Sequence, residues 1–251
     1  MKFGGTSVEN ATAIDRVAGI VKARLAEHPF VVVSAMAKVT DQLLAMAAAA
    51  GRGERDQALE ICHALRERHY LTVGELLDTG LHTELHRELG SEFDSLDELL
   101  RGISAVGELT PRTSDYVVSF GERLSSMIAT AAFLARDIPA VLVDPRQVIV
   151  TDAQHIRAVP QVEEINDRLH DRIQPLIEQQ RVPIMGGFVG ATREGVTTTI
   201  GPITLDPHNP HRTKRTSRRL RPETTNGGQV PPKSEVDWKL KQNGGLSRWV
   251  F

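Results

Sequence analysis

The sequence predicts an α/β fold with a mainly parallel sheet, and three patterns at its start carry this prediction. A short segment ends in the pair Gly4-Gly5, and residues 10–27 then carry apolar side chains at helical spacing. Residues 30–35 form a β-branched run, as in a strand buried on both faces. Strand, helix and strand make a βαβ unit, which places a ligand at the carboxyl ends of parallel strands.

Composition limits the classes of protein to consider. The chain has 251 residues, of which 40% are hydrophobic and 25% charged, as in a globular protein with a sizeable core. Its single cysteine, Cys62, excludes an intramolecular disulfide and any multi-cysteine metal site. No apolar run approaches the ~20 residues of a membrane span, and the N-terminus lacks a signal-peptide pattern. We expect a cytoplasmic protein without a membrane partner.

The middle of the chain is predicted to be helical, without strands, from about residue 41 to 107, and a further helix runs from about 113 to 135. Periodicity assigns several side chains of the first region to the core: Leu43, Leu44, Ala47, Ala58, Ile61, Cys62, Leu65, Leu96, Leu99 and Leu100. The histidines there lack a ligand pattern, so no metal site is predicted.

The remaining part returns to a strand-rich pattern. Residues 140–144 and 148–152 are predicted strands, and residues 162–180 a helix. A strand over 182–190 ends in glycines. Glu194-Gly195 then predicts a hairpin turn, from which residues 196–200 return as a short strand.

The first candidate site is a phosphate cradle made by Lys2, Gly4 and Gly5. Glycine lets backbone N–H groups approach a ligand closely, a following helix would favour an anion at its N-terminus, and a lysine adds a point charge. The pattern differs from a P-loop because the lysine precedes the glycines. The alternative is a strand followed by a plain Gly-Gly turn.

Three further positions are candidates for ligand binding. Ser34 and Thr40 fall at the carboxyl edge of the second strand, although Thr40 or Asp41 would equally well cap a helix beginning at Gln42. Glu122 follows Gly121 in a helix with an apolar face. A lone helical glutamate is usually exposed, but a buried one requires a partner and is a better functional candidate.

Together these motifs resemble the aspartate kinases of the amino acid kinase family. The opening residues 2–8, the serine strand 33–35 and the segment 38–41 match in the family's order. The helix segment 120–125 and the glycine-rich strand and turn at 186–199 follow. The resemblance covers residues 1–201 and implies a three-layer amino acid kinase-like fold.

The resemblance also implies an activity, namely transfer of the ATP γ-phosphoryl group to the β-carboxylate of L-aspartate, with Mg²⁺, at the entry to lysine, threonine and methionine synthesis. It assigns Lys2, Gly4, Gly5 and Ser34 to the phosphate environment, with Lys2 catalytic, and Thr40 and Glu122 to aspartate. In the family the full-length proteins are homo-oligomers.

The sequence departs from the family after Gly201. The family continues Leu-Gly-Arg-Gly-Gly-Ser-Asp, whereas Pro202-Ile203-Thr204-Leu205-Asp206 stands here. We therefore expect residues 202–251 to be a basic, Pro/Gly-rich, disordered tail, and the kinase domain to be truncated before its nucleotide-binding half, with activity doubtful.

Two alternatives follow from this departure. The chain would be the N-terminal piece of a bifunctional aspartate kinase fusion, or a nucleic-acid-binding protein acting through its tail. The second alternative rests on a cluster of cations at Arg212, Lys214, Arg215, Arg218, Arg219 and Arg221. No aromatic residue interleaves that cluster, which makes nucleic-acid binding the weaker alternative.

Overall fold

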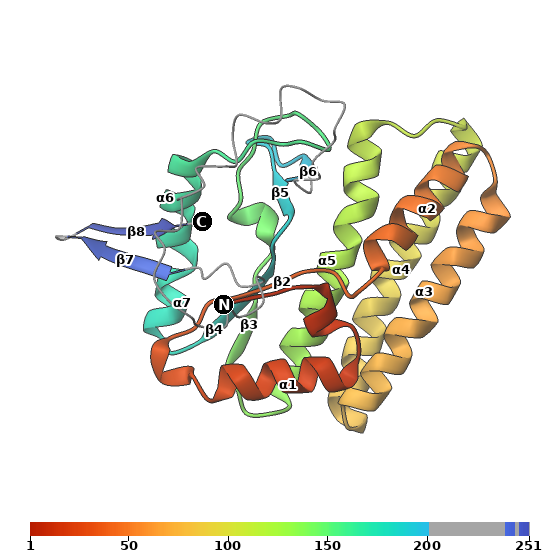
Figure 1. The fold of residues 1–251 in the computed structure, drawn as a ribbon. Helices are drawn as coiled ribbons and strands as arrows, with labels where there is room; N and C mark the ends of the chain where they lie inside the picture. Colours follow the sequence, from red (N-terminus) through yellow and green to blue (C-terminus); the bar gives the residue numbers. More distant parts are fainter. Residues whose placement is uncertain (201–238, 244–245, 251) are drawn as a thin grey trace, which may run out of the picture.

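The computed structural model describes residues 1–200, 239–243 and 246–250 (Figure 1). Its first elements are the predicted βαβ unit: β1 (Lys2–Phe3), α1 (Ala11–Lys22) and β2 (Val31–Val33). The strands are parallel, with Lys2 opposite Val32 and Phe3 opposite Val33. The Asn10 side chain caps α1 by accepting a hydrogen bond from the Ala13 N–H at 2.9 Å.

The central sheet has the strand order β1-β2-β4-β3, and all its pairings are parallel. β3 (Ala140–Leu142) is an edge strand, and β4 (Val182–Gly186) lies between β2 and β3. The register aligns Phe3, Val33 and Gly186, each the last residue of its strand. The predicted parallel sheet is confirmed, and three of its strands end at one edge.

Helices cover both faces of this sheet. Side chains alternate across a strand, so Val31 and Val33 join a core with α1 and α5 (Pro111–Leu134), whereas Val32 joins a second core with α6 (Val162–Arg172). Figure 1 shows α5 between the sheet and the helices α2 (Val39–Gly51), α3 (Arg55–Leu76) and α4 (Thr79–Val106). The predicted three-layer α/β architecture is therefore confirmed.

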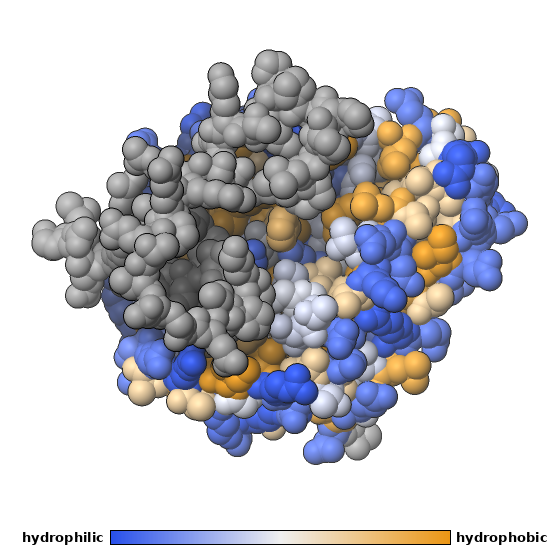
Figure 2. Space-filling model, in the orientation of Figure 1, coloured by the Kyte–Doolittle hydropathy of each residue, from blue (hydrophilic) through white to orange (hydrophobic). Residues whose placement is uncertain are grey.

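The middle region is helical as predicted, but not every side chain assigned to its core is buried. Leu43, Cys62 and Leu65 are fully buried, but Leu44 is 46% exposed, because the residue next to Leu43 is turned by about 100° to solvent. On the surface over α2 and α3, at the right of Figure 2, hydrophobic residues are scattered among hydrophilic ones. α5 is long and apolar enough to cross a membrane, yet 72% of its most apolar window is buried, as in a core helix.

Three predicted elements differ in the second half. Residues 148–152 are not a strand but follow the 3₁₀ turn η3 (Pro145–Gln147), and they make only isolated bridges. The helix over 162–180 is split into α6 and α7 (Gln174–Glu178), because Pro175 lacks the N–H that would continue α6. The strand over 182–190 is interrupted at Gly187-Phe188, giving β4 and β5 (Val189–Ala191).

The predicted hairpin is present. β5 pairs antiparallel with β6 (Thr197–Thr199) around the turn at Gly195, whose φ of 82° suits glycine. Residues 201–238, which hold the basic cluster and the departure from the family, lie outside the described residues. The described part after them is an antiparallel pair, β7 (Lys239–Asn243) with β8 (Leu246–Val250).

Candidate active site

The candidate site lies at the carboxyl edge of β1, β2 and β4. Glu122 reaches this edge from α5, and its side chain is only 5% exposed. The Phe188 backbone N–H donates a hydrogen bond to Glu122 Oε2 at 2.7 Å. The N–H groups of Gly187 and Val189 add to the stabilisation of the carboxylate, although only the Phe188 bond has regular geometry. Glu122 is thus a buried carboxylate with a hydrogen-bond partner, the condition under which a helical glutamate is the better functional candidate.

Burial dominates the electrostatics of Glu122. Desolvation raises the pKa of its carboxyl group to about 7, against the lowering effects of the Phe188 N–H and of the Lys2 charge. The approach to β4 is close, since a Cβ on Gly186 would lie 2.7 Å from Glu122 Oε2. Only glycine fits at that position. The carboxyl group is therefore held in place and titrates near neutral pH.

Lys2 shares this environment. Its Nζ lies 5.2 Å from the centroid of the Phe188 ring, a cation–π distance, and its charge acts on Glu122. Because β1 and β4 flank β2 on either side, these side chains meet across three strands. The structure thus brings together two of the predicted site residues, Lys2 and Glu122.

The glycines form a turn of their own. Gly5 begins the 3₁₀ helix η1 (Gly5–Val8), which separates the glycines from the start of α1 at Ala11. A Cβ on Gly5 would lie 2.9 Å from the Ala35 carbonyl oxygen, whereas Gly4 has open space around it. The Gly5 carbonyl accepts a hydrogen bond from the Ala37 N–H at 3.1 Å. The turn therefore packs against the loop after β2.

Ser34 continues from β2 at the same edge and is half-buried. Its N–H donates to the Phe3 carbonyl at 3.0 Å, and its carbonyl accepts from Ser125 Oγ at 2.8 Å. The backbone of Ser34 is thereby fixed both to β1 and to α5, the helix that carries Glu122.

Thr40 lies in the first turn of α2 with an exposed side chain. Within the described part of the chain, that side chain makes no hydrogen bond to the other predicted site residues. Its neighbour Val39 does approach α5, because a Cβ on Gly121 would lie 3.3 Å from Val39 Cγ1. The start of α2 is thus beside the Glu122 segment, but Thr40 and Glu122 are not in contact.

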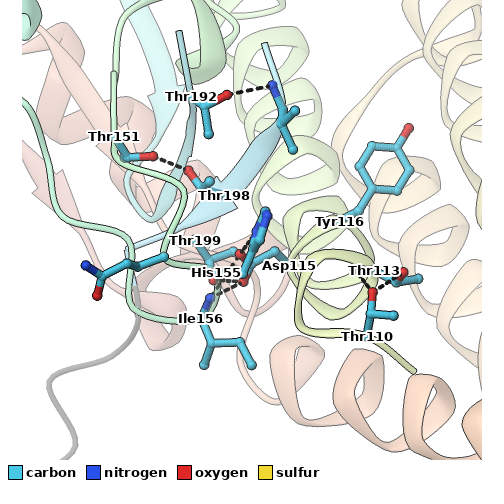
Figure 3. Close-up of polar contacts among 12 residues, drawn as sticks. Thr110, Thr113, Asp115, Tyr116, Thr151, His155, Ile156, Thr192, Thr198 and Thr199 are labelled. Atoms are coloured by element: carbon cyan, nitrogen blue, oxygen red, sulfur yellow. Dashed lines mark hydrogen bonds and ion pairs between the residues drawn. The ribbon is translucent and has the colours of Figure 1, made fainter. Parts of the chain in front are cut away.

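A second buried carboxylate, Asp115, was not predicted as a site residue (Figure 3). It is 2% exposed and accepts a hydrogen bond from Thr199 Oγ1 at 2.5 Å. Its oxygens also accept from the Ile156 N–H at 3.0 Å, and Oδ2 lies 2.8 Å from His155 Nδ1. Asp115 therefore joins α5 to the end of β6 and to the loop before α6.

The spacing of Asp115 and Glu122 along α5 lets this helix hold both strands of the β5–β6 hairpin. Seven residues make almost two full helical turns, so Asp115 and Glu122 share one face of α5. Glu122 holds the chain entering β5 at Phe188, and Asp115 holds the last residue of β6. The sequence signal was this spacing, but Asp115 was overlooked because the helix was predicted to open at Thr113 rather than at the actual cap, Thr110.

Comparisons with known proteins agree with this geometry. The model of the amino acid kinase family matches residues 1–206. The aspartokinase of Chlamydia trachomatis is 34% identical over 203 residues, which cover 80% of this chain and 42% of that protein. The bifunctional aspartokinase/homoserine dehydrogenase 1 of Arabidopsis thaliana is 30% identical over 200 residues, with 79% and 22% covered. The chain thus spans less than half the length of these relatives.

A solved structure shares the fold. Escherichia coli aspartokinase III, in complex with aspartate and ADP, superposes with a TM-score of 0.72 at 29% identity, covering 80% of this chain and 42% of that one. The expected resemblance to aspartokinases is confirmed.

The raised pKa of Glu122 predicts a specific pH dependence of stability. A carboxyl group whose folded-state pKa exceeds its unfolded value of 4.5 stabilises the fold fully below pH 4.5, and this contribution is lost as pH rises through about 7. The Glu122→Gln variant keeps an acceptor for the Phe188 N–H but does not titrate. We expect the wild type to lose on the order of a few kcal/mol relative to this variant between pH 4.5 and 7. Urea unfolding of both proteins across that window measures the difference, and a constant difference would contradict the assignment.

Asp115 predicts a local effect on the hairpin. Asp115→Ala leaves the Thr199 hydroxyl and the Ile156 N–H without their acceptor, which costs about 1 to 3 kcal/mol for each buried donor. Hydrogen exchange at residues 189–199 should therefore accelerate. Asp56→Ala is the control, since that side chain is 95% exposed and its pairing with Arg55 is weak. Equal exchange of the hairpin in the two variants would be inconsistent with a clamp at Asp115.

Proposed function

Because this chain belongs to the amino acid kinase family, we propose that it is part of an aspartokinase, transferring the γ-phosphoryl group of ATP to the β-carboxylate of L-aspartate. The supporting observation is the meeting of Lys2 and Glu122 at the carboxyl edge of three parallel strands. The E. coli relative was solved with aspartate and ADP, the kind of ligand pair that this proposal requires. The proposed setting is cytoplasmic lysine, threonine and methionine synthesis.

In the proposed mechanism, Lys2 contributes positive charge to the phosphoryl group being transferred. Two anions must meet in this reaction, so neutralisation and positioning account for most of the catalysis. Gly4 has open space beside it, which leaves its backbone accessible to a phosphate, while Gly5 fixes the turn against Ala35. Ser34 completes this environment from the adjacent strand end.

Glu122 and Thr40 are proposed to bind aspartate. An ammonium group beside Glu122 favours the ionised carboxylate, and so reverses the rise in pKa that burial produces. Thr40 is exposed at the start of α2, where its hydroxyl is free to meet a substrate carboxylate.

Mg²⁺ is expected for a kinase. Among residues 1–200 and the described β7–β8 pair, no group of three or more His, Cys, Asp or Glu side chains is arranged to hold a metal ion. These residues therefore do not form a protein cage for the ion, and none of the steps above involves it.

The role of Glu122 is tested by the pH dependence of aspartate binding. Between pH 6 and 8 the ionised fraction of a group with a pKa of about 7 rises about tenfold, so L-aspartate should bind about tenfold more tightly at pH 8. Succinate, which lacks the ammonium group, should show no such gain. Titration calorimetry of the wild type, Glu122→Gln and the exposed control Glu60→Gln measures this. Unchanged pH dependence in Glu122→Gln, with Glu60→Gln like the wild type, would exclude the proposed contact.

Turnover by this chain as it stands is expected to be at background. Pro202 stands where the family has its Arg, Ile203-Thr204-Leu205 replace Gly-Gly-Ser before Asp206, and one preorganised charged contact is commonly worth about 10²- to 10³-fold in rate. A coupled assay for ATP consumption with L-aspartate and Mg²⁺ tests this. Aspartate-dependent turnover that Lys2→Ala abolishes would show that the residues after Gly201 supply the missing groups.

A further inference from the structure

A cavity of about 590 Å³ lies at the carboxyl end of β3, at the edge of the sheet. Its wall comes from α4, α5, β3, η3, α6 and α7. This volume is in the range of small-molecule sites, and the carboxyl edge of a parallel sheet is where such sites occur. The cavity is distinct from the site of Glu122, because Arg123, the next residue of α5, is turned by about 100° around the helix.

Two ion pairs line this cavity. Arg123 Nη2 lies 2.5 Å from Glu92 Oε2, and the Arg146 guanidinium donates to both oxygens of Asp144 at 2.6 to 3.0 Å. Burial pushes the pKa of Asp144 upward, but hydrogen bonds from Arg146 and the charges of Arg146 and Arg123 hold it below its usual value. Both carboxylates are therefore already paired with arginines.

A third arginine gives the wall an excess of positive charge. Arg172, at the end of α6, donates to the neutral Gln147 Oε1 at 3.1 Å and has no carboxylate partner in the described part of the chain. Arg123 is held over the Phe120 ring at 4.7 Å, and its buried Nη1 lacks a hydrogen-bond partner among the described residues. The cavity wall thus holds three guanidinium groups and two carboxylates, so some guanidinium N–H groups have no carboxylate partner. Planar guanidinium donors match carboxylate and phosphate oxygens.

The rest of the wall is apolar, with Met127, Val141 and Leu176 among its residues. We propose that this cavity is a second ligand site, which binds a small organic anion carrying a carboxylate or phosphate group on an apolar body. The anionic group meets Arg172 and Arg123, and the body lies against Met127 and Val141. A purely structural role accounts for the two ion pairs, which join α4 to α5 and cap η3, whereas Arg172 has a neutral partner and its charge is left for a ligand.

The methionines offer a direct test. The chain has five, and of these Met127 lines the cavity whereas Met46 is fully buried in the core between α5 and the helices α2 to α4. Methyl NMR of methionine-labelled protein would be recorded during titration with benzoate, phenyl phosphate or benzyl alcohol, three probes with the same ring. We expect a saturable shift of Met127, assigned with Met127→Leu, for the two anions and none for benzyl alcohol. The tighter of the two anions identifies the preferred head group.

Two arginine variants test whether binding needs the positive charge of the cavity wall. Arg172→Gln should weaken binding of the better anion about five-fold, as for the loss of one partly exposed charged contact. Arg16→Gln, an exposed arginine of α1, is the matched control and should leave binding unchanged. The proposal is overturned if Met127 shows no saturable shift, if benzyl alcohol binds as well as the anions, or if Arg172→Gln binds like the wild type. None of these readouts depends on kinase activity, so the aspartokinase proposal stands or falls separately.

Discussion

The burial of one carboxyl group, that of Glu122, constrains the organisation of the candidate site. A carboxylate removed from water needs donors, and here they are backbone N–H groups that become available only because β4 stops at Gly186. Gly186 must be glycine for the carboxyl group to fit. The interruption between β4 and β5 is therefore a requirement of the site, and it places Phe188 beside Lys2.

α5 is the element that transmits this constraint to the rest of the fold. Its apolar residues pack in the larger core, with α1 and the helices α2 to α4, while its two buried carboxylates hold both strands at the open end of the β5–β6 hairpin. Thr151 and Thr198 add a hydroxyl contact of 2.7 Å on the hairpin (Figure 3). Asp115 thus fixes Thr199, the last residue of β6.

Much of this arrangement could be predicted from the sequence, for identifiable reasons. The β-branched run at 31–33 and the period of α1 carry strong local signals, so the βαβ unit and its parallel sheet were predicted correctly. Glu122 was identified because a charged residue beside Gly121 interrupts an apolar face. Residues 148–152 were predicted wrongly as a strand, since composition cannot show that the chain after η3 meets its neighbours only in single bridges.

Other features depend on tertiary contacts that no local pattern encodes. Asp115 looks like an ordinary first-turn residue until the cap at Thr110 shows that it lies in the second turn, facing Thr199. The edge cavity draws its arginines from α5, η3 and α6, positions that only the fold brings together. Thr40 is exposed in the first turn of α2, and no hydrogen bond within the described residues joins it to Glu122, so its expected role in binding aspartate stays a prediction.

The proposed site depends most on the raised pKa of the Glu122 carboxyl group, and this pKa can be measured directly. The ¹³Cδ resonance of Glu122, assigned with Glu122→Gln, would be followed by NMR from pH 3 to pH 9. A buried carboxyl group held by backbone N–H groups beside Lys2 should titrate with a pKa of about 7. A midpoint near 4.5, as for an exposed glutamate, would contradict the proposed site.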